Sequence, residues 1–386
     1  MNDPLAAVLR RGLAETLAGG DHLHDPRWRA AVEGVERHAF LGDAVFRRRD
    51  TSEGSLWEPV RRSDVGADEW LRMAYANELW VTQIDGVSAT DAPGPMTGSP
   101  TSSSSMPGVV VRMLEIAGIG EGDSVLEIGT GTGYSTALIC HRLGEDAVTS
   151  IEYDPAVAAR AAAALAEAGY APTLVQGDGL LGYEKNAEYD RVIATCAVRY
   201  IPMHWMWQVK DGGTITAPVA GWMHSTVLAH LTLADDGTAS GHFSPYGIAF
   251  MPARQHQAPL RPSALYLRHG DERESRIDPR ALEGATGRFV AQLAAPSAEL
   301  IGGGEHVVLL DVATGSQARI GPASAGGWTV SQRGPLRLWD AVEDAILIWQ
   351  AAGSPPWSRF GMTVTRDDQH VWLGAPDGPA WRLPTA

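Results

Sequence analysis

The segment from Val125 to Gly179 constrains the fold of this 386-residue chain more than any other part of it. An apolar run, Val125–Ile128, leads directly into three glycines at alternate positions and then into apolar residues at helical spacing. Glycines in this place let the backbone approach a ligand closely at the carboxyl edge of an open α/β sheet. The segment therefore predicts a ligand site at the end of a buried strand.

The patterns on either side of this segment predict the rest of the core. Apolar runs typical of buried strands alternate with runs at helical spacing, which indicates a parallel sheet covered by helices on both faces. The predicted strands are 124–128, 147–151, 173–176, 190–194 and 214–218, and the predicted helices are 107–117, 134–143 and 155–168. An antiparallel pair, 226–233 and 242–250, is expected to follow. The predicted fold class is a doubly wound, Rossmann-like α/β sheet.

The segments that flank the core follow other patterns. Runs at helical spacing over 4–18, 26–39 and 68–79 predict an N-terminal helical cap without a sheet. Residues 83–105 are rich in Gly, Pro, Ser, Thr and Asp, which is typical of a long loop. The predicted division of the chain is a cap with its serine-rich loop over 1–105, a core over 106–258 and a C-terminal module over 259–386.

Short strand patterns and longer helical patterns mix in the C-terminal module, which predicts an α+β architecture. The strand candidates include 306–311 and 370–373, and the helix candidates are 279–293 and 336–349. Six tryptophans lie in this module: Trp328, Trp339, Trp349, Trp357, Trp372 and Trp381. Core packing explains such a density, and a recognition surface is the alternative.

Composition excludes several classes of partner. The 46 acidic against 31 basic residues give a net charge of −15, which repels a phosphate backbone and argues against a general nucleic-acid binder. Solubility or a basic or zwitterionic partner would each fit this charge. The two cysteines, the lack of a leader pattern and the lack of a run of roughly 18 apolar residues predict a cytoplasmic protein without a membrane partner. The histidines have no metal-ligand spacing with the cysteines, so no metal is expected.

Charge distinguishes the glycine turn from a dinucleotide site. Glu127 stands just before the turn, where it would repel a pyrophosphate but hold the ammonium group of a methionine moiety. The glycine spacing also departs from the G-x-G-x-x-G fingerprint, and no P-loop lysine is present.

Two further carboxylates follow the next two predicted strands. Glu152 is placed to accept the hydroxyls of a ribose, and Asp178 to accept an adenine amino group, with Gly179 leaving room for the ring. Each acid alone is equally well explained as a solvated residue at a strand end. Three of them at successive strand ends, with glycines at the first and third, predict S-adenosylmethionine as cofactor.

Beyond the cofactor segment, residues 27–252 as a whole resemble the protein L-isoaspartyl O-methyltransferase family. The matching motifs are VERHAF at 35–40, AYAN at 74–77, SSSMP at 103–107, the glycine turn, GDG at 177–179, YIP at 200–202 and DGGT at 211–214. The resemblance implies a methyltransferase-type sheet and an S-adenosylmethionine-dependent carboxyl O-methyltransferase, with S-adenosylhomocysteine as product.

The resemblance also implies the roles of individual residues. Ser105 matches the active-site serine and would orient the acceptor carboxylate, although a flexible serine linker or a helix cap would explain the same residue. The expected cofactor contacts are Ser102, Ser103, Ser104, Glu127, Gly129, Thr130, Gly131, Thr132, Gly133, Glu152, Tyr153, Asp178 and Gly179. Arg199 and Tyr200 are the expected substrate contacts.

Two departures from the repair enzymes bear on the substrate. The loop over 83–101 is longer, and the C-terminal module is added. This combination resembles the actinobacterial branch that accompanies ribosomal peptide products made with an ATP-grasp ligase. It implies methylation of an ordinary Asp in a modified precursor peptide, whose ester cyclises to an aspartimide. Repair of isoaspartyl residues in damaged proteins and peptide binding without chemistry are the alternatives, and the oligomeric state is left open.

Overall fold

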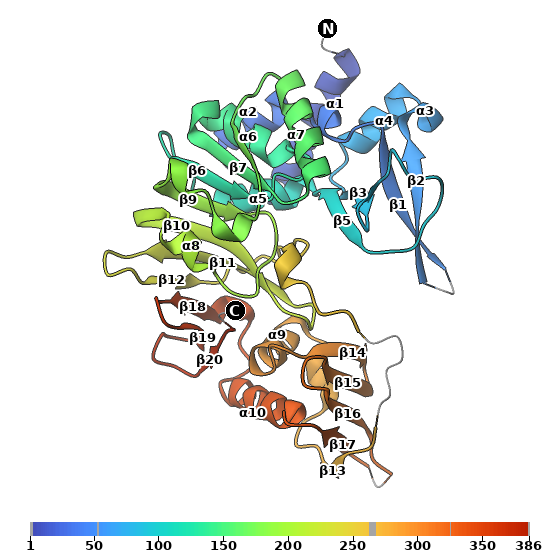
Figure 1. Ribbon diagram of the computed structural model, residues 1–386, viewed down its shortest axis with the longest axis vertical. Coiled ribbons are helices and arrows are strands. Elements are labelled where there is room, and N and C mark those ends of the chain that lie inside the picture. The colour runs from blue at the N-terminus through green and yellow to red at the C-terminus, as the bar shows by residue number, and fades with distance from the viewer. Residues whose placement is uncertain (1–2, 52–53, 262–267, 325, 385–386) are drawn as a thin grey trace. The chain divides into compact units, whose positions relative to one another are not determined.

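The computed structural model describes residues 3–51, 54–261, 268–324 and 326–384 (Figure 1). The chain divides into two compact units, of which the first comprises Met1–Thr195 with Trp207–Thr216 and the second Cys196–Met206 with Ala217–Ala386. The predicted α/β fold class is confirmed. The division of the chain that the sequence predicts, into a cap, a core and a C-terminal module, stays a prediction.

A parallel sheet forms the core of the first unit, in the order β10-β9-β6-β7-β8. Its strands are β6 (Val125–Ile128), β7 (Val148–Glu152), β8 (Thr173–Gln176), β9 (Tyr189–Ala194) and β10 (Val209–Ala220), and its helices are α5 (Pro107–Ile116), α6 (Tyr134–Leu143) and α7 (Pro155–Glu167). All but β10 lie within one residue of the predicted bounds. Strand β10 begins earlier because the glycines before Thr214 are accommodated as an irregularity of the strand.

The N-terminal region contains the predicted helices, α1 (Pro4–Gly19), α2 (Pro26–Gly34) and α4 (Ala67–Ala74), of which the latter two end earlier than expected. The prediction that it lacks a sheet is wrong, because five strands pair there. They are β1 (Ala44–Thr51), β2 (Gly54–Arg61), β3 (Trp80–Ile84), β4 (Val87–Ser88) and β5 (Pro100–Ser104), in the order β2-β1-β3-β4 with β5 also paired to β3.

Charged residues concealed this sheet in the sequence. Strand β1 is buried only at its first three residues and continues as an exposed Arg-Arg-Arg-Asp run, so the alternation typical of a strand is short. The predicted loop over 83–105 contains β4 and β5, and Pro100 is tolerated as the first residue of its strand. Phe46, Trp57 and Ile84 pack together in the apolar cluster beneath these strands.

The second unit has the predicted α+β architecture. One set of neighbouring antiparallel strands consists, in order, of β11 (Thr226–Leu233), β12 (Ala239–His242), β18 (Phe360–Val364), β19 (Gln369–Leu373) and β20 (Ala380–Arg382). A separate antiparallel sheet consists, in order, of β13 (Asp271–Glu274), β17 (Trp328–Arg333), β16 (Ser316–Pro322), β15 (His306–Asp311) and β14 (Glu299–Gly303). The helices are α8 (Met203–Met206), α9 (Ala285–Ala294) and α10 (Leu338–Ala351). The predicted pairing of 226–233 with 242–250 is displaced, because the partner strand is β12.

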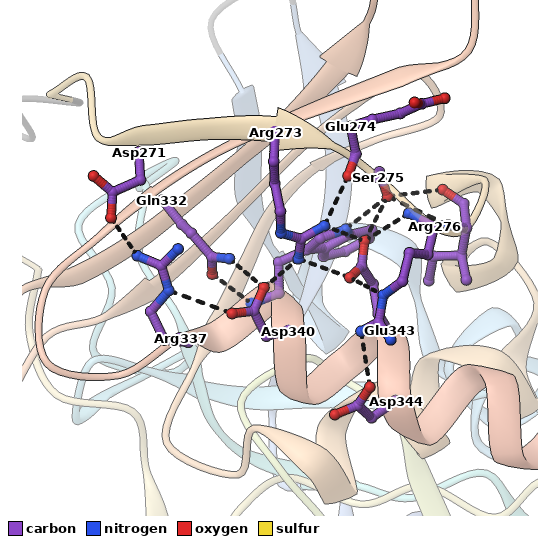
Figure 2. A network of polar contacts seen from close by, with 12 residues as sticks. Asp271, Arg273, Glu274, Ser275, Arg276, Gln332, Arg337, Asp340, Glu343 and Asp344 are labelled. Atoms are coloured by element: carbon purple, nitrogen blue, oxygen red, sulfur yellow. Dashed lines mark hydrogen bonds and ion pairs between the residues drawn. The ribbon is translucent and has the colours of Figure 1, made fainter.

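A buried carboxylate anchors α10 to the sheet of β13 (Figure 2). The Glu343 side chain is fully buried and accepts hydrogen bonds from Arg273 at 2.7 and 3.0 Å and from Arg276 and Ser275 at 2.9 Å. Burial acts to raise the pKa of Glu343, but the hydrogen bonds from the arginines outweigh it and hold the pKa below its ordinary value. Buried Trp339 donates its indole N–H to Ser275 at 2.9 Å and so joins the same network.

Of the other five tryptophans in the predicted module 259–386, Trp372 is buried and four are half-buried. Core packing therefore accounts for two of the six. Within the described ranges, no helix has the length and hydropathy of a membrane span, and no group of three His, Cys, Asp or Glu residues is arranged to hold a metal ion.

Candidate cofactor and substrate site

The turn between β6 and α6 has the backbone that its glycines predict. Gly129, Gly131 and Gly133 have φ angles of 98°, 56° and 93°, in the left-handed region that favours glycine. A Cβ atom on Gly129 would lie 2.7 Å from the Thr195 hydroxyl, so close packing also requires glycine there. A Cβ on Gly131 would meet nothing nearer than the Ser103 carbonyl oxygen at 3.8 Å, which leaves space beside the backbone at this position.

Glu152, the last residue of β7, holds the turn in place. Its two carboxylate oxygens accept the backbone N–H groups of Gly131 at 2.9 Å and Asp154 at 3.0 Å. Burial raises the pKa of Glu152, and these hydrogen bonds partly oppose the rise. A carboxylate offers about four lone-pair sites, so each oxygen retains room for a further donor such as a ribose hydroxyl.

Glu127 points into the protein. Its side chain is fully buried and accepts hydrogen bonds from Ser135 and Thr136 of α6 at 2.5 Å and from Ser150 of β7 at 2.7 Å. Burial raises the pKa of this carboxyl group against the effect of the three hydroxyls. Glu127 thus joins β6, α6 and β7 around the turn, and its predicted contact with an ammonium group stays a prediction.

Asp178 begins a short turn after β8. Its Oδ1 atom accepts the backbone N–H of Leu180 at 2.9 Å, and within the described residues its other oxygen accepts no hydrogen bond. A Cβ on Gly179 would lie 2.4 Å from a methyl carbon of Ile128. The structure therefore explains this glycine by close packing against β6, whereas the sequence suggested room for an adenine ring.

The remaining predicted cofactor residues differ in exposure. Thr130 is buried and shares a 2.6 Å hydrogen bond with the Ser150 hydroxyl, while Thr132 is half-buried and Tyr153 is exposed.

The serine run forms an edge of the N-terminal sheet. Ser102 and Ser104 of β5 are buried and bonded to Thr82 and Arg37, while Ser103 is half-buried. The linker explanation is therefore wrong. Ser105 follows the strand, but the cap of α5 is Met106, without a side-chain hydrogen bond, so Ser105 is not a helix cap. Its hydroxyl makes no hydrogen bond to any residue that the structure describes.

Gln83 of β3 lies beside the candidate cofactor residues, and the sequence did not indicate this position. It is buried, accepts from the Thr101 hydroxyl at 2.7 Å and donates to Asp154 at 3.1 Å. Asp154 also caps α7 through the backbone N–H groups of Ala156 and Val157, a role that the Asp-Pro sequence at the helix start could have revealed. Gln83 therefore ties the N-terminal sheet to the loop that follows Glu152.

The predicted substrate residues lie in the second unit. The Arg199 guanidinium stacks on Trp222 at 3.8 Å and donates to the Pro296 carbonyl at 2.9 Å, and burial lowers its pKa. The Tyr200 ring packs against His256 with centroids 4.6 Å apart. Both side chains have partners within their own unit, and their contact with a substrate stays a prediction.

A parallel sheet with a left-handed glycine turn after β6 and carboxylates at the ends of β7 and β8 defines the class of S-adenosylmethionine-dependent methyltransferases. The residues present fit this cofactor, because Glu152 and Asp178 retain acceptor capacity and the backbone at Gly131 is open.

Comparison with known proteins identifies the family. Residues 73–257 match the family described as Protein-L-isoaspartate(D-aspartate) O-methyltransferase. Protein-L-isoaspartate O-methyltransferase from Ignicoccus hospitalis is 34% identical over 55% of this chain and 92% of its own length. Protein-L-isoaspartate O-methyltransferase 2 from Archaeoglobus fulgidus is 39% identical over 42% of this chain and 70% of its own length. The chain belongs to the protein-L-isoaspartate O-methyltransferase family.

A solved structure described as protein-L-isoaspartate O-methyltransferase shares the fold. It aligns with a TM-score of 0.55 and 19% identity over 95% of this chain and 100% of its own length. Because the alignment covers 95% of the chain, the fold likeness includes most of the second unit.

Proposed function

We propose that this chain esterifies an Asp side-chain carboxylate in a ribosomally made peptide that an ATP-grasp ligase has modified, and that the ester then closes to an aspartimide. The Ser105 hydroxyl is the observation that carries the proposal. The buried serines beside it are bonded to protein, whereas Ser105 is half-buried and has no hydrogen bond to a described residue. A hydroxyl held in this way is available to a substrate oxygen.

Methyl transfer to a carboxylate requires few catalytic groups from the protein's side chains. Bound S-adenosylmethionine supplies an activated methyl group, and a carboxylate is already ionised at neutral pH, so no general base is required. Ser105 would donate to one carboxylate oxygen and direct the other towards the methyl group. Glu152, Asp178 and the glycine turn would hold the cofactor. Good alignment of this kind contributes up to about 7–11 kcal/mol to lowering the barrier.

Ring closure follows from the ester itself. The backbone nitrogen of the residue after the Asp attacks the ester carbonyl carbon, a C–N bond forms, and the methoxy group leaves with the amide proton as methanol. A methyl ester is a far better acyl donor than a carboxylate, so this step needs no further group from the protein.

The ordered segment between β3 and β5 supports a dedicated peptide substrate. Met96 exchanges backbone hydrogen bonds of 2.8 and 2.9 Å with Trp57 of β2, and Arg61 donates to the Ala92 carbonyl at 2.7 Å. The segment is thus joined to the sheet whose strand β5 ends just before Ser105. In our proposal its added length would give a peptide more surface to bind than a short turn would.

Repair of isoaspartyl residues in damaged proteins is the second candidate. The names of the related proteins favour it, and methylation of an isoaspartyl carboxylate would use the same site. The second unit does not decide between the two candidates, since most of it has a counterpart in the solved structure of similar fold.

The test compares two peptides, one with an isoaspartyl residue and one crosslinked by an ATP-grasp ligase and containing ordinary Asp. Mass spectrometry would follow the gain of a methyl group and then the loss of methanol. We expect turnover on the crosslinked peptide, a reduced rate with Ser105→Ala at retained cofactor affinity, and an unchanged rate with Ser63→Ala, an exposed serine of the same unit. Robust turnover on the isoaspartyl peptide alone would replace our proposal by repair.

A further inference from the structure

Arg37, in the short turn η1 (Arg37–Phe40), is a fully buried cation whose hydrogen bonds all go to neutral groups. Its guanidinium donates to the carbonyl oxygens of Ala74 at 2.6 Å, Ala76 at 3.0 Å, Glu78 at 2.9 Å and Ser105 at 3.1 Å, and to the Ser104 hydroxyl at 3.4 Å. Within the described part of the chain, no carboxylate lies at ion-pair distance from it.

Burial without a counter-ion is costly for a guanidinium. Desolvation lowers the pKa of Arg37 to about 10, so the group still carries its charge at neutral pH. A neutral side chain of similar volume would avoid this cost but could not supply several donors in one plane. The value of Arg37 to the fold therefore lies in the backbone that its planar fork holds.

That backbone belongs to two segments, and the two meet beside the serine run. One segment runs from the end of α4 to Glu78, just before β3, and the other is the end of β5. Strands β3 and β5 pair at Trp80 and Ser104. A single nitrogen atom, Nη2, donates both to the Glu78 carbonyl and to the Ser105 carbonyl. The peptide group that follows Ser105 is thus held at its oxygen atom.

Arg37 also contacts the start of α6. Its guanidinium carbon lies 5.7 Å from the ring centroid of Tyr134, the first residue of that helix and the neighbour of Gly133 in the glycine turn. Tyr134 is itself buried. One side chain therefore contacts both the residue proposed to orient the substrate and the helix that begins at the predicted cofactor turn.

We propose that Arg37 is a positioning residue for methyl transfer, which fixes the Ser105 peptide so that its hydroxyl faces the acceptor carboxylate in register with the glycine turn. This inference rests on the proposed role of Ser105. Arg37 does not touch the substrate, so it acts on the rate through Ser105 and not on the affinity for cofactor.

The test is Arg37→Lys, which keeps the charge but replaces the two donor nitrogens of the planar fork by a single ammonium nitrogen, which cannot reach all four carbonyl oxygens at once. We expect kcat to fall by about 10- to 100-fold, since small displacements of a reacting group have effects of this size. KM for the peptide and the Kd of S-adenosylhomocysteine, measured by calorimetry, should change far less than kcat.

Arg142→Lys is the matched control. Arg142 is also a buried arginine of the first unit, bonded to Asp25 at 2.7 Å and to the Ile119 carbonyl at 2.8 Å and stacked on Trp28 at 4.3 Å, without contact to the serine run. We expect a comparable loss of thermal stability and an unchanged kcat. Equal losses of kcat in the two variants would show that Arg37 acts only on stability and would overturn the inference.

Two further outcomes separate the inference from the proposed function. Wild-type turnover by folded Arg37→Lys, together with an impaired Ser105→Ala variant, would refute the role of Arg37 alone. Wild-type turnover by Ser105→Ala would refute the role of Ser105 and the inference with it. If Arg37→Lys does not fold, Ser104→Ala decides, because it removes one Arg37 acceptor and leaves the cation in place. An unchanged kcat in Ser104→Ala would then overturn the inference.

Discussion

Replacing Glu152 by Gln isolates the charge at the end of β7 with almost no change in shape. In the native protein, one carboxylate oxygen accepts the N–H of Gly131 and the other accepts the N–H of Asp154. In Glu152→Gln, one of these oxygens becomes an NH₂ group that faces a backbone donor. Either the N–H of Gly131 or the N–H of Asp154 then loses its hydrogen-bond acceptor. One of the two oxygen atoms proposed to accept the ribose hydroxyls is lost as well.

The size of the effect follows from these contacts. A hydrogen bond to a charged group contributes about 1.5–3 kcal/mol, and each 1.4 kcal/mol is about tenfold in Kd. Loss of one such bond to the cofactor therefore predicts roughly 10- to 100-fold weaker binding of S-adenosylhomocysteine. The unpaired backbone N–H adds about 1–3 kcal/mol of lost stability.

Isothermal titration calorimetry at neutral pH measures the Kd, and thermal unfolding without ligand measures the stability. Glu145→Gln is the control, because Glu145 also accepts one backbone N–H, that of Ala171 at 2.9 Å, but lies in an exposed position away from the glycine turn. We expect the control to bind as the wild type does. Equal Kd values for Glu152→Gln and the wild type would refute the assignment of Glu152 to the cofactor.

Two further predictions concern stability. Glu343→Gln should destabilise the second unit by about 3–5 kcal/mol, because it leaves two arginines without their buried counter-charge. Urea unfolding followed by tryptophan fluorescence measures this loss, and Asp344→Asn, at an exposed partner of Arg276, should cost only about 0–1 kcal/mol. Similar effects of the two changes would contradict the stabilising role assigned to the Glu343 network. Burial acts to raise the pKa of Asp190, but Lys210 and Ser124 outweigh it and lower the pKa from 3.8 to about 2. A lowered folded-state pKa stabilises the folded state above the unfolded value of 3.8, and that stability is lost as the pH falls towards 2. Asp190→Asn should therefore remove at most about 2–3 kcal/mol of pH-dependent stability in this window; parallel acid-unfolding curves for variant and wild type would exclude it.

The core elements could be predicted almost residue by residue because their signals are local. Strand β6 is buried at all four residues, and helix α7 begins with an Asp cap and a proline at its first turn. The N-terminal sheet escaped prediction because the charged end of β1 hides its alternation and because β5 consists of Pro, Thr and Ser, whose strand form depends on pairing with β3.

The residues in and beside the candidate site likewise fall into those that a local sequence pattern indicates and those that it does not. Glu152, Asp178 and the glycine turn could be predicted as cofactor residues because they follow successive strands, and their contact with the cofactor stays a prediction. The contacts of Arg37 and Gln83 beside the candidate site could not be predicted, because their partners lie 68 and 71 residues away along the chain, at Ser105 and Asp154. No pattern within a window of sequence carries such a contact.

By itself, the sequence from Val125 to Gly179 determined the class of cofactor, because parallel strands end at one edge of their sheet and bring their terminal residues together. The resemblance to the family came from motifs spread over residues 27–252. Only the tertiary structure decided what those residues touch. It directs Glu127 to three hydroxyls, places Gly179 against Ile128 and leaves the Ser105 hydroxyl without a partner among the described residues. The direction of a side chain depends on packing between distant segments, and spacing along the chain does not contain it.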